Sequence, residues 1–183
     1  DESMPDNVDP KSDGGSYTVA EHKWDEAFGY FGARRDFLNP AADGDCVDLT
    51  SEHNFGWASY ATKRDNDTEN IAYRNGVMFK ADIFNAFVAG RAIIHNEGTV
   101  DELAPHMATI RTRFEQLCAA NVVHYVHSVL NAMGDLTDAS DAMSSESESY
   151  NKYWSEMRGF IISLQYNVGE VSGGLTSAQL DDI

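Results

Sequence analysis

The stretch from Glu21 to Gly32 constrains the fold more than any other part of this chain, because its side chains divide into two faces of one helix. At helical spacing one face is apolar and mostly aromatic, and it consists of Trp24, Ala27, Phe28 and Phe31. The opposite face carries His22, Asp25, Glu26 and Gly29. The apolar face is typical of a helix that packs into a core. The polar face can hold a cation or can simply be solvated, and the sequence leaves both interpretations open.

Helical periodicity recurs along the chain, and we find no run of alternating apolar residues that would indicate a sheet. The sequence therefore predicts an all-α fold, an up-and-down helical bundle of four main helices with short helices and a long acidic loop at 32–54. Capping boxes at Thr18–Glu21 and Thr99–Glu102 mark two helix starts. The predicted helices cover 18–31, 55–64, 70–96, 99 to 131 or 133, and 150–167, with the first turn of another at 175–183.

The chain has 183 residues, of which 42% are hydrophobic, so we expect one domain with a sizeable core. Residues 1–15 are rich in Asp, Pro, Gly and Ser and are predicted to be an irregular lead-in, followed by a helical domain over 16–183. The sequence begins at Asp1 without an initiator Met, so we expect it to be part of a longer precursor that carried any targeting signal.

The net charge of −17 argues against a nucleic-acid partner, because there is no basic patch to meet phosphate. The charge favours solubility and attracts cations, although a solvated acidic surface, which needs no ligand, is the stronger explanation. No apolar run reaches the length of a membrane span. Cys46 and Cys118 fit no zinc motif, and their pairing in an oxidising compartment stays open.

The polar face of the first helix contains the strongest candidate metal ligands. His22 and Asp25 are three residues apart, a spacing with which carboxylate-rich bundles bind metals, and Glu26 is adjacent. One helix cannot complete such a site, so a second element must supply further ligands. The candidates for these further ligands are His53, His124, His127 and Glu156.

A weaker candidate is the acidic loop segment with Asp43, Asp45 and Asp48. Calcium binds several oxygens from flexible loops, which these carboxylates could supply. The EF-hand template does not fit, because its glycine is misplaced and its closing Glu is absent, so a solvated loop is the other interpretation.

No motif for catalysis or for an organic cofactor is found. The sequence lacks a phosphate-binding glycine loop, His-Glu-x-x-His, Gly-x-Ser-x-Gly and Cys-x-x-Cys-His. We therefore assign no catalytic residue and expect no organic cofactor.

Five ordered stretches resemble an uncharacterised family of exported bacterial proteins that is distantly similar to the imelysin-like proteins. Together they run through most of residues 17–183, and the first and last are the most specific. They are HKWDEAFGYFG (22–32), FGWASYATKRD (55–65), MFKADIFNAFVAGRAII (78–94), IRTRFEQLCAANVVHYV (110–126) and YWSEMRGFIISLQYN (153–167).

The resemblance implies an all-helical protein that is periplasmic or extracellular, with a lipid anchor as one form, and of which this chain is the C-terminal portion. Imelysin-like proteins carry a Gly-x-His-x-x-Glu motif linked to metal binding. Here His22 matches the His, Asp25 stands at the Glu position and Ala20 replaces the Gly.

The resemblance thus predicts a non-enzymatic protein that binds a divalent metal (iron, zinc or calcium) or assists its uptake. Two alternatives are a metal-dependent peptidase and a structural or assembly subunit. The partners of such a subunit would be other chains or the missing N-terminal part.

Overall fold

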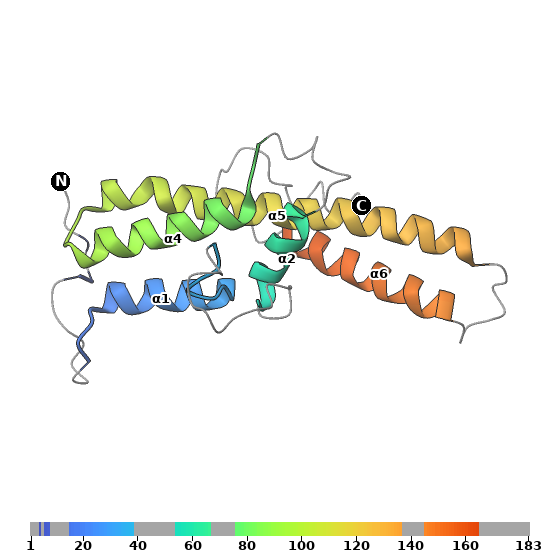
Figure 1. Cartoon of the computed structure of the whole chain (residues 1–183), viewed down its shortest axis with the longest axis horizontal. Coiled ribbons are helices and arrows are strands. Elements are labelled where there is room, and N and C mark those ends of the chain that lie inside the picture. Colours follow the sequence, from blue (N-terminus) through green and yellow to red (C-terminus); the bar gives the residue numbers. More distant parts are fainter. Residues whose placement is uncertain are drawn as a thin grey trace. The chain divides into compact units, whose positions relative to one another are not determined.

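The fold is known from a computed structural model, which describes residues 4, 6–7, 15–38, 54–66, 76–136 and 145–164. These residues form helices and contain no strand, which confirms the predicted all-α class. The helices are α1 (Val19–Phe31), α2 (Gly56–Asp65), α4 (Phe79–His95), α5 (Val100–Asp135) and α6 (Ser145–Ser163) (Figure 1). None of the described helices is long and apolar enough to cross a membrane.

The chain divides into two compact units, residues 1–113 and 114–183, and α5 belongs to both. The first unit contains α1, α2, α4 and the first part of α5, and the second contains the rest of α5 with α6. This division does not test the predicted single domain over 16–183, because α5 continues from one unit into the other.

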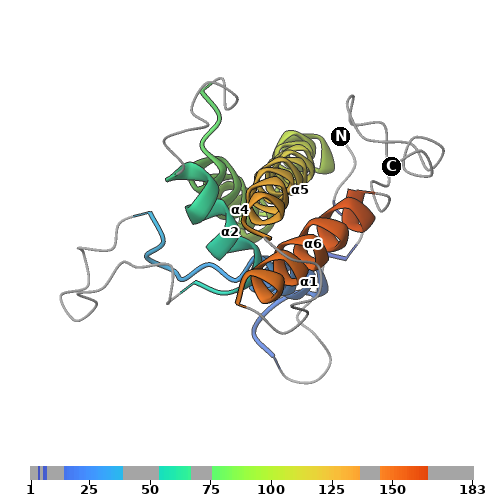
Figure 2. The same cartoon turned by 90° about the vertical axis from the view of Figure 1, so that its right-hand side faces the viewer.

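In the first unit, α1 and α4 lie side by side and run antiparallel, and α2 packs against both (Figures 1 and 2). The aromatic residues of the predicted apolar face of α1 pack against α4, whereas Ala27, predicted on the same face, is exposed. The Phe28 ring lies 5.8 Å from that of Phe84 and 5.5 Å from that of Phe87. Phe31 is fully buried. Edge-to-face ring pairs of this kind stabilise a core beyond the area that they bury.

Trp24 fixes the distance between α1 and α4. Its indole Nε1 donates a hydrogen bond to the Phe87 carbonyl oxygen at 2.9 Å. Its ring lies against Gly90, where a Cβ atom would overlap it. Gly90 is thus required for the close approach of the two helices.

A second apolar cluster joins Met4 to the end of α4 and the start of α5. Met4, Ile94 and Leu103 are buried together, and Ala20, Trp24 and Ile93 pack against them. Part of the stretch predicted as an irregular lead-in therefore contributes to the core of the first unit.

Two helix starts differ from the predictions. The helix predicted from residue 70 begins at Phe79, and Gly76, at φ +82°, lies before it. Asp65, at the end of α2, accepts hydrogen bonds from the Phe79 and Lys80 N–H groups and so caps α4. The last helix begins at Ser145 rather than at residue 150. The helical turn predicted at 175–183 and most of the predicted acidic loop (39–53) lie outside the described residues.

The described residues of the second unit form a helix pair. The Tyr125 ring on α5 stacks on the Phe160 ring of α6, with centroids 5.7 Å apart and an interplanar angle of 11°. The buried residues of this part of α5 follow one face and include Leu117, Asn121, Tyr125, Val129 and Ala132.

Candidate functional site

The first turn of α1 builds the polar centre of the first unit. The Glu21 N–H donates to Thr18 Oγ1 at 3.1 Å, and the Thr18 N–H donates back to Glu21 Oε2 at 2.9 Å. This is the capping box predicted from the sequence, and it satisfies two backbone donors that a helix start leaves without partners.

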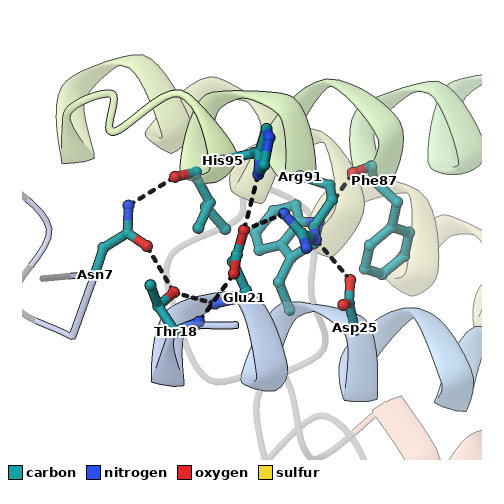
Figure 3. A network of polar contacts seen from close by, with 9 residues as sticks. Asn7, Thr18, Glu21, Asp25, Phe87, Arg91 and His95 are labelled. Carbon is teal, nitrogen blue, oxygen red and sulfur yellow. Dashed lines mark hydrogen bonds and ion pairs between the residues drawn. The ribbon is translucent and has the colours of Figure 1, made fainter. Parts of the chain in front are cut away.

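The other carboxylate oxygen of Glu21 faces α4 (Figure 3). Arg91 Nη1 donates to Oε1 at 2.7 Å, and His95 Nδ1 lies 3.1 Å from the same oxygen. The Glu21 side chain is only 8% exposed. The Thr18 backbone hydrogen bond, followed by those from His95 and Arg91, holds the pKa of Glu21 below its usual value against the opposing effect of burial.

Asp25 lies one turn after Glu21 and also reaches Arg91. The Arg91 Nε donates to Asp25 Oδ1 at 3.0 Å, so one guanidinium bridges two carboxylates of α1 (Figure 3). The Asp25 side chain is 57% exposed, so solvent screens this ion pair far more than the one with Glu21. The sequence suggested Asp25 as a metal ligand, but its carboxylate accepts a hydrogen bond from Arg91 instead.

The N-terminal segment closes this network at its other end. Thr18 Oγ1 donates to Asn7 Oδ1, and Asn7 Nδ2 donates to the Ile94 carbonyl oxygen, each at 2.7 Å (Figure 3). The network thus joins the N-terminal segment, the start of α1 and the end of α4. Its main chemical effect is to hold these parts together around an ionised carboxylate.

His22 and Glu26 lie on the outer face of α1, opposite the side that carries Trp24 and Phe28. His22 Nε2 and Glu26 Oε1 are 3.4 Å apart, and their side chains are 37% and 58% exposed. The imidazole also stacks on the Tyr17 ring, with centroids 5.4 Å apart. An imidazole nitrogen and a carboxylate oxygen this close on a solvated helical face can share a cation.

The described part of the chain gathers no group of three or more His, Cys, Asp or Glu side chains that could hold a metal. Of the predicted ligands, the structure brings His22 and Glu26 together and places Asp25 on Arg91. Asp43, Asp45, Asp48 and His53 lie outside the described residues.

The other suggested ligands lie on the two helices of the second unit. His124 on α5 packs edge-on against the adjacent Tyr125 ring, and the exposed His127 lies on the same helix. Glu156, on α6, has one buried oxygen without a hydrogen-bond partner. These residues therefore offer single groups rather than a cluster.

Sequence reasoning missed Arg91 and His95 and recognised Glu21 only as a cap. A signal was present, because Arg91 and His95 lie four residues apart in an otherwise apolar segment of α4. Such spacing indicates one polar stripe on a mostly apolar helix, which can meet a partner of opposite charge.

Cys118 is buried with a free thiol. Burial, with a further contribution from the negative charge of Glu115, raises its pKa to about 11. The thiolate, which is the reactive form, is therefore scarce at neutral pH. Cys46 lies outside the described residues, so the question of their pairing stays open.

Comparison with known protein families places the chain. A family model described as "Domain of unknown function (DUF4856)" matches residues 4–182. The chain belongs to the DUF4856 family. The match includes both units and every residue of the Glu21 network, so this network lies within the DUF4856 domain. No curated protein and no solved structure matches the chain significantly.

Proposed function

We propose that this DUF4856 protein is a non-enzymatic helical protein that binds a divalent metal ion at the outer face of α1, through His22 and Glu26. The observation that supports the proposal is the 3.4 Å separation of His22 Nε2 and Glu26 Oε1 on an exposed face. Both groups can turn toward one ion without breaking a helix cap or a buried ion pair.

The chemistry of the pair favours some metals over others. An imidazole with one carboxylate suits zinc, iron and similar transition metals, whereas calcium prefers a set of oxygens. The net charge of −17 raises the local concentration of any cation. Asp25 is left out of the proposed ligand set because its oxygen accepts from Arg91.

A role in metal uptake outside the cytoplasm, as in imelysin-like proteins, is part of the same proposal. Its support is the resemblance of residues 22–32 and 153–167, together with the His22 match. Cell fractionation of the natural host would test it, and a purely cytoplasmic protein would refute this part.

Isothermal titration of chelator-treated protein with ZnCl₂ tests metal binding. We expect saturable binding that His22→Ala and Glu26→Gln each weaken by more than about tenfold, as loss of a ligand should. His127→Ala, which removes another exposed imidazole, and Asp25→Asn serve as matched controls and should bind like the unmodified protein. Equal binding by all variants, or no binding, would refute the assignment.

A further inference from the structure

The N-terminal segment of the first unit contacts the helices as a bound peptide would. Its described residues are Met4, Asp6 and Asn7, which we call the strap. The Asn7 N–H donates to the Met4 carbonyl oxygen at 3.2 Å, so the strap forms a turn. Both end residues reach Ile94, Met4 by packing in the same apolar cluster and Asn7 by a hydrogen bond. The strap therefore presents two side chains to one place on the first unit.

Met4 is the apolar anchor of the strap. It is 6% exposed and lies in one buried cluster with Ile94 and Leu103. Partly buried side chains of α1 and α4 complete this pocket, and they are Ala20, Trp24 and Ile93. Three helices thus form a pocket around one unbranched side chain, and the flexible thioether of methionine fits irregular apolar surfaces well.

The hydrogen bonds of the strap go to groups at helix ends. The Ala20 N–H, in the first turn of α1, donates to the Asp6 carbonyl oxygen at 3.1 Å. Asn7 Nδ2 donates to the Ile94 carbonyl oxygen, in the last turn of α4, and Asn7 Oδ1 accepts from Thr18 Oγ1. Helix ends leave such backbone groups without intrahelical partners, so a ligand can bind them. Position 7 needs one donor and one acceptor, which an amide supplies and a carboxylate does not.

The site under the strap is held together by contacts that do not involve the strap. Arg91 and His95 bind Glu21 and so hold the start of α1 against the end of α4. The Gly98 N–H donates to the Ile93 carbonyl oxygen at 2.9 Å and fixes the connection from α4 to α5. The site should therefore keep its shape when the strap leaves it.

We propose that this site binds peptides and that the strap is its internal ligand, which a second peptide with the pattern Met-x-x-Asn can replace. The residue before the Asn is less restricted. The Asp6 carboxylate meets Lys23 at 2.8 Å, but both side chains are more than half exposed, and such ion pairs contribute little. The proposal is independent of the metal site at His22 and Glu26.

Covalent attachment makes the strap a strong competitor of any free peptide. Residues 8–18 join it to α1, so the strap meets its site at an effective concentration on the order of 1 mM. A free peptide at micromolar concentration should therefore bind poorly to the unmodified protein, and well only after the strap has been released.

Fluorescence anisotropy of a labelled peptide with the sequence of residues 1–8, DESMPDNV, tests the proposal. The released variant is the full chain with Met4→Asp and Asn7→Asp. These changes place a charge against the apolar pocket and an acceptor against the Ile94 carbonyl oxygen. We expect saturable binding to the released variant that is at least about tenfold tighter than binding to the unmodified protein.

Matched changes show whether the peptide uses this site. Peptides with Met4→Gln or Asn7→Ala keep the net charge and should each bind at least about tenfold more weakly, because they lose the apolar anchor or the side-chain hydrogen bonds. In the released variant, Leu103→Ala should also weaken binding, since it removes part of the pocket. Ile162→Ala, an apolar truncation in the second unit, should not.

Circular dichroism of the released variant decides whether the strap is a ligand or an essential part of the fold. An unchanged helical signal together with the expected binding supports the proposal. Loss of the helical signal would overturn it, because the site would then not exist without the strap. A folded released variant that binds no peptide, equal binding by the unmodified protein, or equal binding of the altered peptides would overturn it as well.

Discussion

Replacement of Glu21 by alanine should destabilise the first unit more than the loss of a helix cap alone would. The substitution removes the carboxylate that accepts from the Thr18 N–H, from Arg91 and from His95. Loss of a helix cap costs about 1 kcal/mol. Loss of a charge-assisted hydrogen bond to Arg91, which is one-third exposed, costs about 1.5 kcal/mol. We therefore expect the free energy of unfolding to fall by about 2.5 kcal/mol.

Asp25→Ala provides the control, because it removes the other carboxylate on the same guanidinium. Asp25 is 57% exposed, and ion pairs of this kind contribute about 0.5 kcal/mol. Urea unfolding followed by circular dichroism at pH 7 gives both free energies from the midpoint and slope. If Glu21→Ala cost no more than Asp25→Ala, the argument that burial makes Glu21 the central group of the network would be wrong.

Three further predictions concern Glu21, two helical glycines and Cys118. The pKa of Glu21 is lower in the folded protein than in the unfolded chain, so its negative charge stabilises the fold at any pH above the unfolded-state pKa. The difference in free energy of unfolding between the unmodified protein and Glu21→Gln should therefore shrink as the pH falls below about 4. Gly90→Ala should lower the melting temperature, with a cost of about 1–3 kcal/mol from overlap with the Trp24 ring, whereas Gly29→Ala should raise it because its space is open. Cys118 should resist iodoacetamide at pH 8 in the folded protein and react fully in urea, as peptide mass mapping would show; rapid labelling of the native protein would contradict its burial and raised pKa.

Local patterns made α1 predictable in detail. The capping box set its start, Gly32 in the left-handed conformation ends it, and the spacing of Trp24, Phe28 and Phe31 identified the buried face. These signals lie within a few residues of one another, so a single sequence contains all the information that they need.

The start of α4 and the partners of α1 could not be predicted in the same way. Asp65 caps α4 from the end of another helix, and Arg91 meets Glu21 across 70 positions of sequence. Helical periodicity placed Asp25 beside His22 and Glu26, but it could not show that Asp25 pairs with Arg91 of α4. Pairings between distant elements depend on tertiary packing, for which one sequence carries no direct signal.

Asp65 couples the stability of two helix ends, because its carboxylate accepts from the Phe79 and Lys80 N–H groups while Asp65 itself closes α2. The last turn of α2 and the first turn of α4 should therefore open together rather than one at a time. Hydrogen exchange should show similar protection for the amides of both turns, and Asp65→Ala should lower the protection of both.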